Sequence, residues 1–239
     1  MDTKLAHHVN LKAKNGQSVE ICLKINPRSR RISLKIDSKN RQAIATAPNA
    51  QSTQAALDFA QSKIDWIVAK LAELPSQQVL EIGSYVPLRG EKHLIQTALK
   101  GRTVHIDDSS QPLKLMVPGR QDQTAAKVTG FLRAAARADL SRRVKAHAET
   151  LNVQPASISI KDTRTRWGSC STKRNLNFSW RLVCAPPFVL DYVAAHECAH
   201  LLEMNHSKRF WAHVARCIPN AEPAKQWLNT NGRALHAIG

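Results

Sequence analysis

One predicted helix in the C-terminal part of the chain carries two histidines on its apolar face. Val189, Val193, His196 and His200 recur at the spacing of one helical face, so both imidazoles are expected to point toward the interior. Leaving such polar groups buried without partners costs about 1–3 kcal/mol each. Glu197 completes a His-Glu-x-x-His sequence, in which two imidazoles one turn apart can bind one metal ion and the carboxylate can reach a water molecule. The pattern therefore favours a fold with a metal site at this helix.

A third imidazole follows the motif. His206 comes six residues after His200, and on a continuous helix it would lie about 120° around and about 9 Å further along. The helix must therefore end near Met204 if His206 is to reach the same ion. Ser207 is a suitable N-cap for a new helix over residues 208–217. We expect a chain reversal between the two helices that returns His206 to the metal.

Two carboxylates are alternatives to His206 as the third ligand. Glu222 is the stronger one, and Glu203 is weaker because it follows His200 by only three residues. Imidazole ligands suit zinc among the available metals. Three protein ligands leave a position open for water, as in catalytic zinc sites, whereas structural sites use four. A binding domain with a structural zinc would need a fourth ligand near the histidines, and none is obvious in the sequence.

The rest of the chain predicts an α+β fold. Alternating apolar residues indicate an antiparallel β meander near the N-terminus, and apolar residues at helical spacing indicate one short and one long helix. We expect a β-rich N-terminal region with one helix over residues 1–118 and a second domain over residues 119–239, separated at Pro118-Gly119. The predicted elements are a meander over 18–47, a helix over 52–73, short strands within 79–118, a helix over 122–150, a hairpin over 164–180 and the helix from Pro187.

The charge of the chain is strongly positive. Its 239 residues include 35 Lys and Arg against 18 Asp and Glu, a formal charge of +17. This balance favours an anionic partner such as nucleic acid, nucleotide or acidic protein, although no base-reading motif accompanies it.

The compartment can also be predicted. The sequence has no apolar run of the roughly 18 residues that span a membrane and no secretory signal. Its five cysteines are scattered, which is typical of a protein with free thiols in the reducing cytoplasm.

Three segments together resemble the YgjP-like family of predicted metal-dependent hydrolases, which is related to the SprT-like and WLM metallopeptidases. They are Arg166-Trp-Gly-Ser-Cys170, His196-Glu-Cys-Ala-His200 and Asn205-His-Ser-Lys-Arg-Phe-Trp211. The basic run over residues 27–36 is also similar to that family. The spacing to His206 matches the metzincin pattern as well, but Glu203 stands where that pattern has glycine, so we do not interpret the chain as a metzincin.

The resemblance implies a zincin-like catalytic part and a zinc-dependent hydrolase, foremost a metallopeptidase with a peptide or protein substrate. It implies that zinc is bound by His196, His200 and His206 and that Glu197 is the catalytic base. A cationic or phenolic group would stabilise the oxyanion that forms on the substrate. The sequence offers four candidates for this role, namely Tyr192, Arg166, Arg209 and His213.

Two other enzyme functions stay open at this point. The positive charge would also suit a metal-dependent hydrolase of nucleotides or other phosphate compounds, although no glycine-rich phosphate loop is present. The kinship with SprT-like proteases would suit a nucleic-acid-associated protease that acts on bound proteins. The oligomeric state does not follow from the residues.

Overall fold

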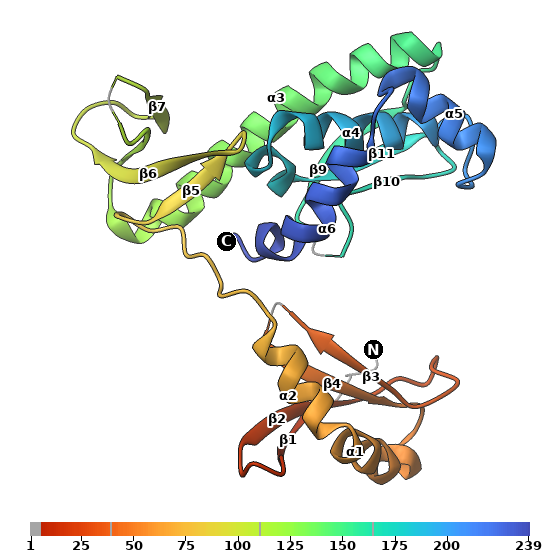
Figure 1. Cartoon of the computed structure of the whole chain (residues 1–239). Coiled ribbons are helices and arrows are strands. Elements are labelled where there is room, and N and C mark those ends of the chain that lie inside the picture. Colours follow the sequence, from red (N-terminus) through yellow and green to blue (C-terminus); the bar gives the residue numbers. More distant parts are fainter. Residues whose placement is uncertain (1–5, 39, 110, 164) are drawn as a thin grey trace. The chain divides into compact units, whose positions relative to one another are not determined.

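The structure of the chain is a computed structural model that describes residues 6–38, 40–109, 111–163 and 165–239 (Figure 1). It has the mixed α+β composition expected from the sequence. The chain divides into two compact units, Met1–Pro75 and Ser76–Gly239. No helix in the described ranges combines the length and the apolar character needed to cross a membrane.

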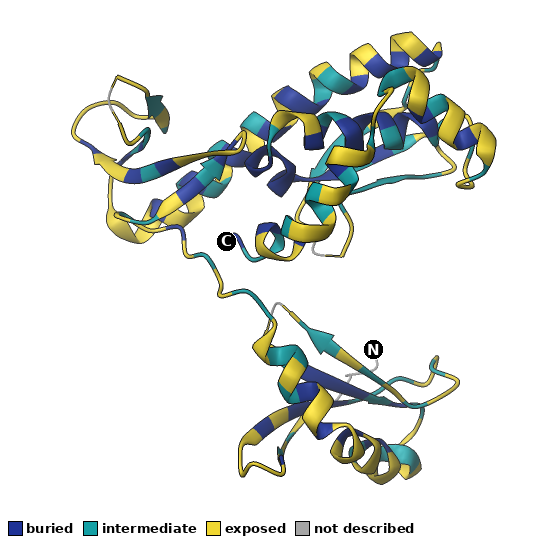
Figure 2. Cartoon of the chain, viewed as in Figure 1, coloured by how far each residue is buried: buried dark blue, intermediate teal, exposed yellow. Residues whose placement is uncertain are grey.

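The first unit is a four-stranded sheet with two helices packed against it. The strand order is β1-β2-β4-β3. Apolar residues of the strands and helices, such as Ile21, Ala45, Ala56 and Ile67, form its core (Figure 2). The elements are β1 (Ala6–Lys12), β2 (Ser18–Ile25), β3 (Ser33–Asp37), β4 (Gln42–Ala47), α1 (Thr53–Ser62) and α2 (Ile64–Ala72).

Two predictions for this unit need correction. β4 lies between β2 and β3 and runs parallel to β2, so the sheet is mixed rather than an antiparallel meander. The alternation of side chains has the same period in parallel and antiparallel strands, and it therefore does not identify the neighbouring strand. The single helix expected over residues 52–73 is two helices that meet at Lys63.

The second unit begins with a sheet of the same topology. Its order is β5-β6-β8-β7, again with a parallel central pair and antiparallel outer pairs. In both units the fourth strand is followed by a single 3₁₀ turn and a helix that begins at a threonine, Thr53 or Thr124. A proline lies near the end of each fourth strand, Pro48 just after β4 and Pro118 as the last residue of β8. The strands are β5 (Tyr85–Leu88), β6 (Glu91–Ala98), β7 (His105–Asp107) and β8 (Lys114–Pro118).

The domain boundary predicted at residues 118 and 119 lies inside this second unit. Pro118 ends β8 and Gly119 begins the connection to α3. Ile95 and Leu115 of the sheet share one core with Val128 and Leu132 of α3. A proline-glycine pair marks a change of chain direction, which occurs inside domains as well as between them.

The remaining elements surround α4. The long helix expected over residues 122–150 is α3, and it packs along α4 (Figure 1). The expected hairpin is β10 and β11, and β9 adds to it in parallel, giving the order β10-β11-β9. These elements are α3 (Thr124–Leu151), β9 (Ser157–Lys161), β10 (Gly168–Cys170), β11 (Asn175–Ser179), α4 (Pro187–Ala199), α5 (Lys208–Cys217) and α6 (Glu222–His236).

Candidate metal centre

The last turn of α4 carries the first half of the motif. Pro187 starts the helix, where a missing N–H costs nothing. His196 and Glu197 lie in its final turn, and His200 is the C-cap residue. The helix therefore ends earlier than the expected position near Met204. His200 stabilises this end, because its Nδ1–H donates a hydrogen bond to the main-chain oxygen of Glu203 over 3.0 Å.

The chain then reverses and α5 begins where the sequence predicted. Ser207 is the N-cap, and its hydroxyl oxygen accepts a hydrogen bond from the main-chain N–H of Phe210 over 3.3 Å. Such a cap is worth about 1 kcal/mol. The short connection between α4 and α5 brings His206 back toward the end of α4.

The three predicted histidines come together. One ring nitrogen from each of His196, His200 and His206 lies within 4.8 Å of the other two, and in the described part of the chain no further metal-ligating group joins them. The Nε2 atoms of His196 and His206 are 3.1 Å apart. Tetrahedral zinc with Zn–N bonds of 2.0–2.1 Å would hold its nitrogens about 3.3 Å from each other. The three-imidazole donor set and the separation of His196 from His206 therefore fit one zinc ion, and three protein ligands would leave its fourth position open.

The protonation states also suit a metal. Burial lowers the pKa of His196 to about 4, and the neighbouring His200, His206 and Lys225 act in the same direction. Burial likewise lowers the pKa of His200. The hydrogen bond from Nδ1 of His200 leaves its Nε2 as the atom with a free lone pair. Both rings are thus neutral near pH 7, which is the form that binds metal.

Aromatic side chains fix the positions of the imidazoles. The Phe210 ring is fully buried, and its centroid lies 4.5–4.8 Å from those of all three histidines. Trp211 stacks near His206 at 5.9 Å, and the Lys225 ammonium lies 4.3 Å from the centroid of the Trp211 ring. The site therefore has an apolar floor and one cationic side chain at its rim.

Glu197 is separate from the three nitrogens and is held in a confined position. Its side chain is 5 % exposed, and Oε2 has no hydrogen-bond partner among the described residues. Burial raises its pKa to about 8, which the charge of Arg166 opposes. A Cβ atom on Gly168 would lie only 2.5 Å from Oε1, so the glycine of β10 makes room for this carboxylate.

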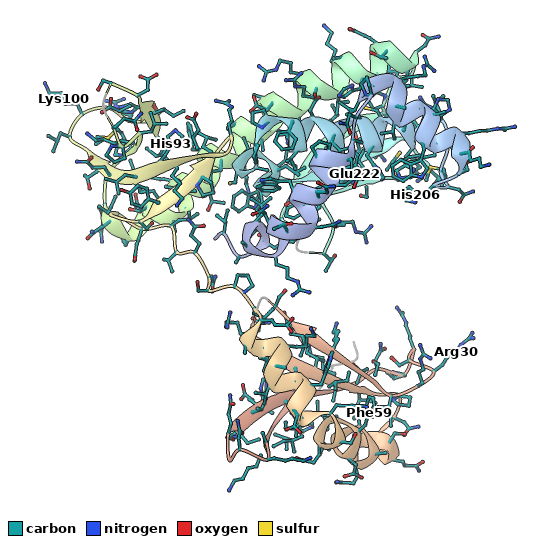
Figure 3. All side chains as sticks on the ribbon, viewed as in Figure 1. Arg30, Phe59, His93, Lys100, His206 and Glu222 are labelled. Carbon is teal, nitrogen blue, oxygen red and sulfur yellow. The ribbon has the colours of Figure 1, made fainter. Side chains whose placement is uncertain are left out.

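The alternative third ligands do not join the histidines. Glu222 lies at the start of α6 (Figure 3). Its Oε2 is 3.9 Å from Nζ of Lys225, and its carboxylate is outside the cluster that the described residues form. Glu203 contributes its main-chain oxygen to His200 rather than its carboxylate to the cluster. Of the three candidates, the structure brings only His206 to the two motif histidines.

The four candidates for an oxyanion-stabilising group are placed differently. Tyr192 is buried and lies edge-on to His196, with ring centroids 5.9 Å apart, and burial raises the pKa of its phenol. Arg166 is close enough for its charge to act on Glu197. Arg209 and His213 lie on α5, and among the residues that the structure describes no ring or hydrogen-bond contact joins either to the cluster. The structure therefore favours Tyr192 and Arg166.

Two residues of the site were not identified from the sequence. Gly168 lies within the Arg-Trp-Gly-Ser-Cys segment, and a glycine inside a predicted strand is a known sign of close approach. Lys225 carries no comparable signal, because one lysine on an amphipathic helix looks like any solvated residue. It is recognised only by its contact with Trp211 and its effect on His196.

Comparisons with known proteins identify the family of the chain. The sequence profile of the YgjP-like, metallopeptidase domain family matches residues 30–231. No curated protein matches the chain. Among solved structures, the chain is similar to the metallopeptidase zymogen abylysin from Pyrococcus abyssi, with 20% identity and a TM-score of 0.34 over 38% of this chain and 90% of that one.

Proposed function

This chain belongs to the YgjP-like family of metallopeptidase domains, and on that basis we propose that it is a zinc-dependent peptidase. In this proposal His196, His200 and His206 hold the zinc ion and Glu197 is the general base. The substrate is an extended peptide or protein segment. The cytoplasm is the proposed compartment. The five cysteines support it, because they carry free thiols, which is typical of proteins in a reducing compartment.

The observation that carries the proposal is that the three histidines and Glu197 occupy different positions in the site. One nitrogen of each of the three imidazoles lies within 4.8 Å of the other two, while the Glu197 carboxylate is buried and is not among these ligand atoms. A structural zinc site would use a fourth protein ligand. The open position and the adjacent carboxylate instead support a hydrolytic site.

Zinc, when bound, supplies Lewis acidity toward water and toward a carbonyl oxygen. The protein supplies the proton transfer. Glu197 accepts the proton of the attacking water at its carboxylate and returns a proton to the nitrogen that leaves. Its burial raises its affinity for that proton, and a general base of suitable pKa contributes about 10²–10⁴-fold to the rate.

A hydrogen-bond donor is needed to stabilise the negative charge that develops on the substrate oxygen. Tyr192 supports this role because its phenol stays protonated and lies beside His196. Arg166 supports a second role, since its positive charge near Glu197 stabilises the ionised form of the base.

The decisive experiment compares Glu197→Gln with His206→Ala. The Gln variant should retain one zinc per chain by elemental analysis and lose peptide hydrolysis by about 10²–10⁴-fold. The Ala variant should lose both zinc and activity, whereas His105→Ala, at an exposed histidine of β7, should lose neither. Casein-derived peptides and nucleoside triphosphates are assayed in parallel. Release of phosphate that depends on Glu197, without peptide cleavage, would overturn the peptidase proposal.

A further inference from the structure

β10 is an edge strand with main-chain groups available for pairing. It lies at the end of the order β10-β11-β9. On either side of it, Trp167 and Ser171 form main-chain hydrogen bonds toward the β11 side of the hairpin, over 2.9 Å and 3.0 Å. Because bonding direction alternates along an antiparallel ladder, Ser169 also faces β11, whereas Gly168 and Cys170 direct their N–H and C=O groups to the open side. An extended peptide can therefore pair with Gly168 and Cys170.

The position of the base sets the register of a peptide that pairs antiparallel to β10, as β11 does. Glu197 lies against Gly168, so the bond to be cleaved lies near the peptide residue opposite Gly168. In antiparallel pairing, the residue opposite Cys170 comes two positions earlier in the peptide. Directly opposed residues point their side chains to the same face of a sheet. The Cβ position of Gly168 faces α4, and Cys170 shares that face, so the earlier residue also points its side chain there.

A pocket lies at this place. It has a volume of about 320 Å³, room for roughly ten water molecules, and lies between the end of the hairpin and the chain that follows α4. Leu202 and Met204 are 45% and 47% exposed, unusual for such large apolar side chains. The lining includes Cys170, Thr172, Arg174, His200, Leu202 and Met204.

The only cation in the lining is held by the main chain. The Arg174 guanidinium donates to the oxygen of Gln154 over 3.0 Å and 2.8 Å, and to the oxygen of Leu201 over 3.4 Å. These hydrogen bonds stabilise the main chain around the pocket. The positive charge of Arg174 still repels a second cation. The pocket suits a large uncharged side chain and disfavours lysine or arginine.

We infer that this pocket binds an apolar side chain on the amino-terminal side of the scissile bond, and that Leu202 and Met204 determine this specificity. The inference rests on the proposed peptidase function and adds to it a substrate class: extended segments with a bulky apolar residue shortly before the cleaved bond.

The test uses the zinc-loaded protein and a mixed peptide library, with cleaved bonds identified by mass spectrometry. Leu, Met or Phe should be enriched at least 10-fold over Gly, Asp and Lys at one position on the amino side of the bond, the size expected for an apolar pocket. Met204→Ser and Leu202→Ser should each reduce this enrichment several-fold. Leu99→Ser, at a leucine that is 96% exposed outside the pocket, should leave it unchanged.

A binding experiment tests the specificity of the pocket separately from the proposed peptidase activity. Zinc-loaded Glu197→Gln protein is titrated with a fluorescein-labelled peptide containing a central Leu and with its Asp and Lys counterparts, and anisotropy is recorded. Tighter binding of the Leu peptide, if it is lost in the Glu197→Gln, Met204→Ser double variant, supports the pocket whether or not any peptide is hydrolysed. Failure of the wild-type protein to hydrolyse peptides would refute only the peptidase function. Equal binding of the three peptides, or a preference for Asp that depends on Arg174, would overturn the inference.

Discussion

Replacing Gly168 by alanine tests the contact between the edge strand and the base. The added Cβ would lie 2.5 Å from Oε1, 2.6 Å from Cγ and 2.8 Å from Cδ of Glu197. Ordinary contact distances begin near 3.5 Å, so the carboxylate or the strand must move by about 1 Å. Glu197 is buried and has little room to rotate. A displacement of about 1 Å at a reacting group can reduce the rate roughly 10²-fold.

We therefore expect Gly168→Ala to lower kcat/KM for peptide hydrolysis about 100-fold, equivalent to about 2.7 kcal/mol in the activation barrier. The free energy of unfolding should fall by about 1–3 kcal/mol through overpacking, and zinc content should stay at the wild-type value because the histidines are untouched. Gly130→Ala is the matched control. Its Cβ meets no atom within 4 Å on α3, so activity should be unchanged and stability should rise by up to about 1 kcal/mol. Wild-type kcat/KM in folded, zinc-loaded Gly168→Ala would refute the placement of the base.

Three further predictions concern stability. In metal-free protein, burial raises the pKa of Glu197 to about 8, so the folded state keeps a proton that the unfolded chain releases above about pH 4.5. The contribution of Glu197 to the free energy of unfolding should therefore decrease by roughly 4–5 kcal/mol from pH 4.5 to 8, while the lowered pKa of His196 acts in the opposite direction at the acid end of this range. The difference between wild type and Glu197→Gln in urea titrations with EDTA isolates the Glu197 contribution, and identical pH slopes would contradict the assigned burial. Ser207→Ala removes the cap of α5 and should lower Tm by about 2–4 °C, while Ser207→Asp retains it. Residues 1–75 have their own core and should fold alone with cooperative thermal unfolding by circular dichroism, whereas a non-cooperative fragment would show that the first unit depends on the second.

Local chemistry explains which parts of the site could be predicted. The i, i+4 spacing of His196 and His200 fixes their common face, and Ser207 marks the start of the next helix, so the return of His206 follows from helix geometry. The end of α4 at Ala199 was harder to predict, because it depends on the main-chain oxygen of Glu203, which no residue type reveals.

Long-range contacts explain what could not be predicted. The parallel pairing of β2 with β4 joins strands that are not adjacent in sequence, and no property of either strand selects its neighbour. Gly168 and Lys225 meet the site through tertiary packing alone. The domain boundary depended on the same kind of information, since residues 76–118 belong to the second unit through tertiary contacts such as the core that the second sheet shares with α3.

The repeated sheet topology shows how one architectural motif acquires two uses. After the fourth strand of the first sheet, the helical segment breaks at Lys63 and ends at Ala72, so that motif is complete in itself. After the fourth strand of the second sheet, α3 continues for 28 residues. Its first turns cover the sheet and its later turns form the wall against which α4 packs. The length of one helix thus separates a self-contained module from a scaffold that can present three imidazoles.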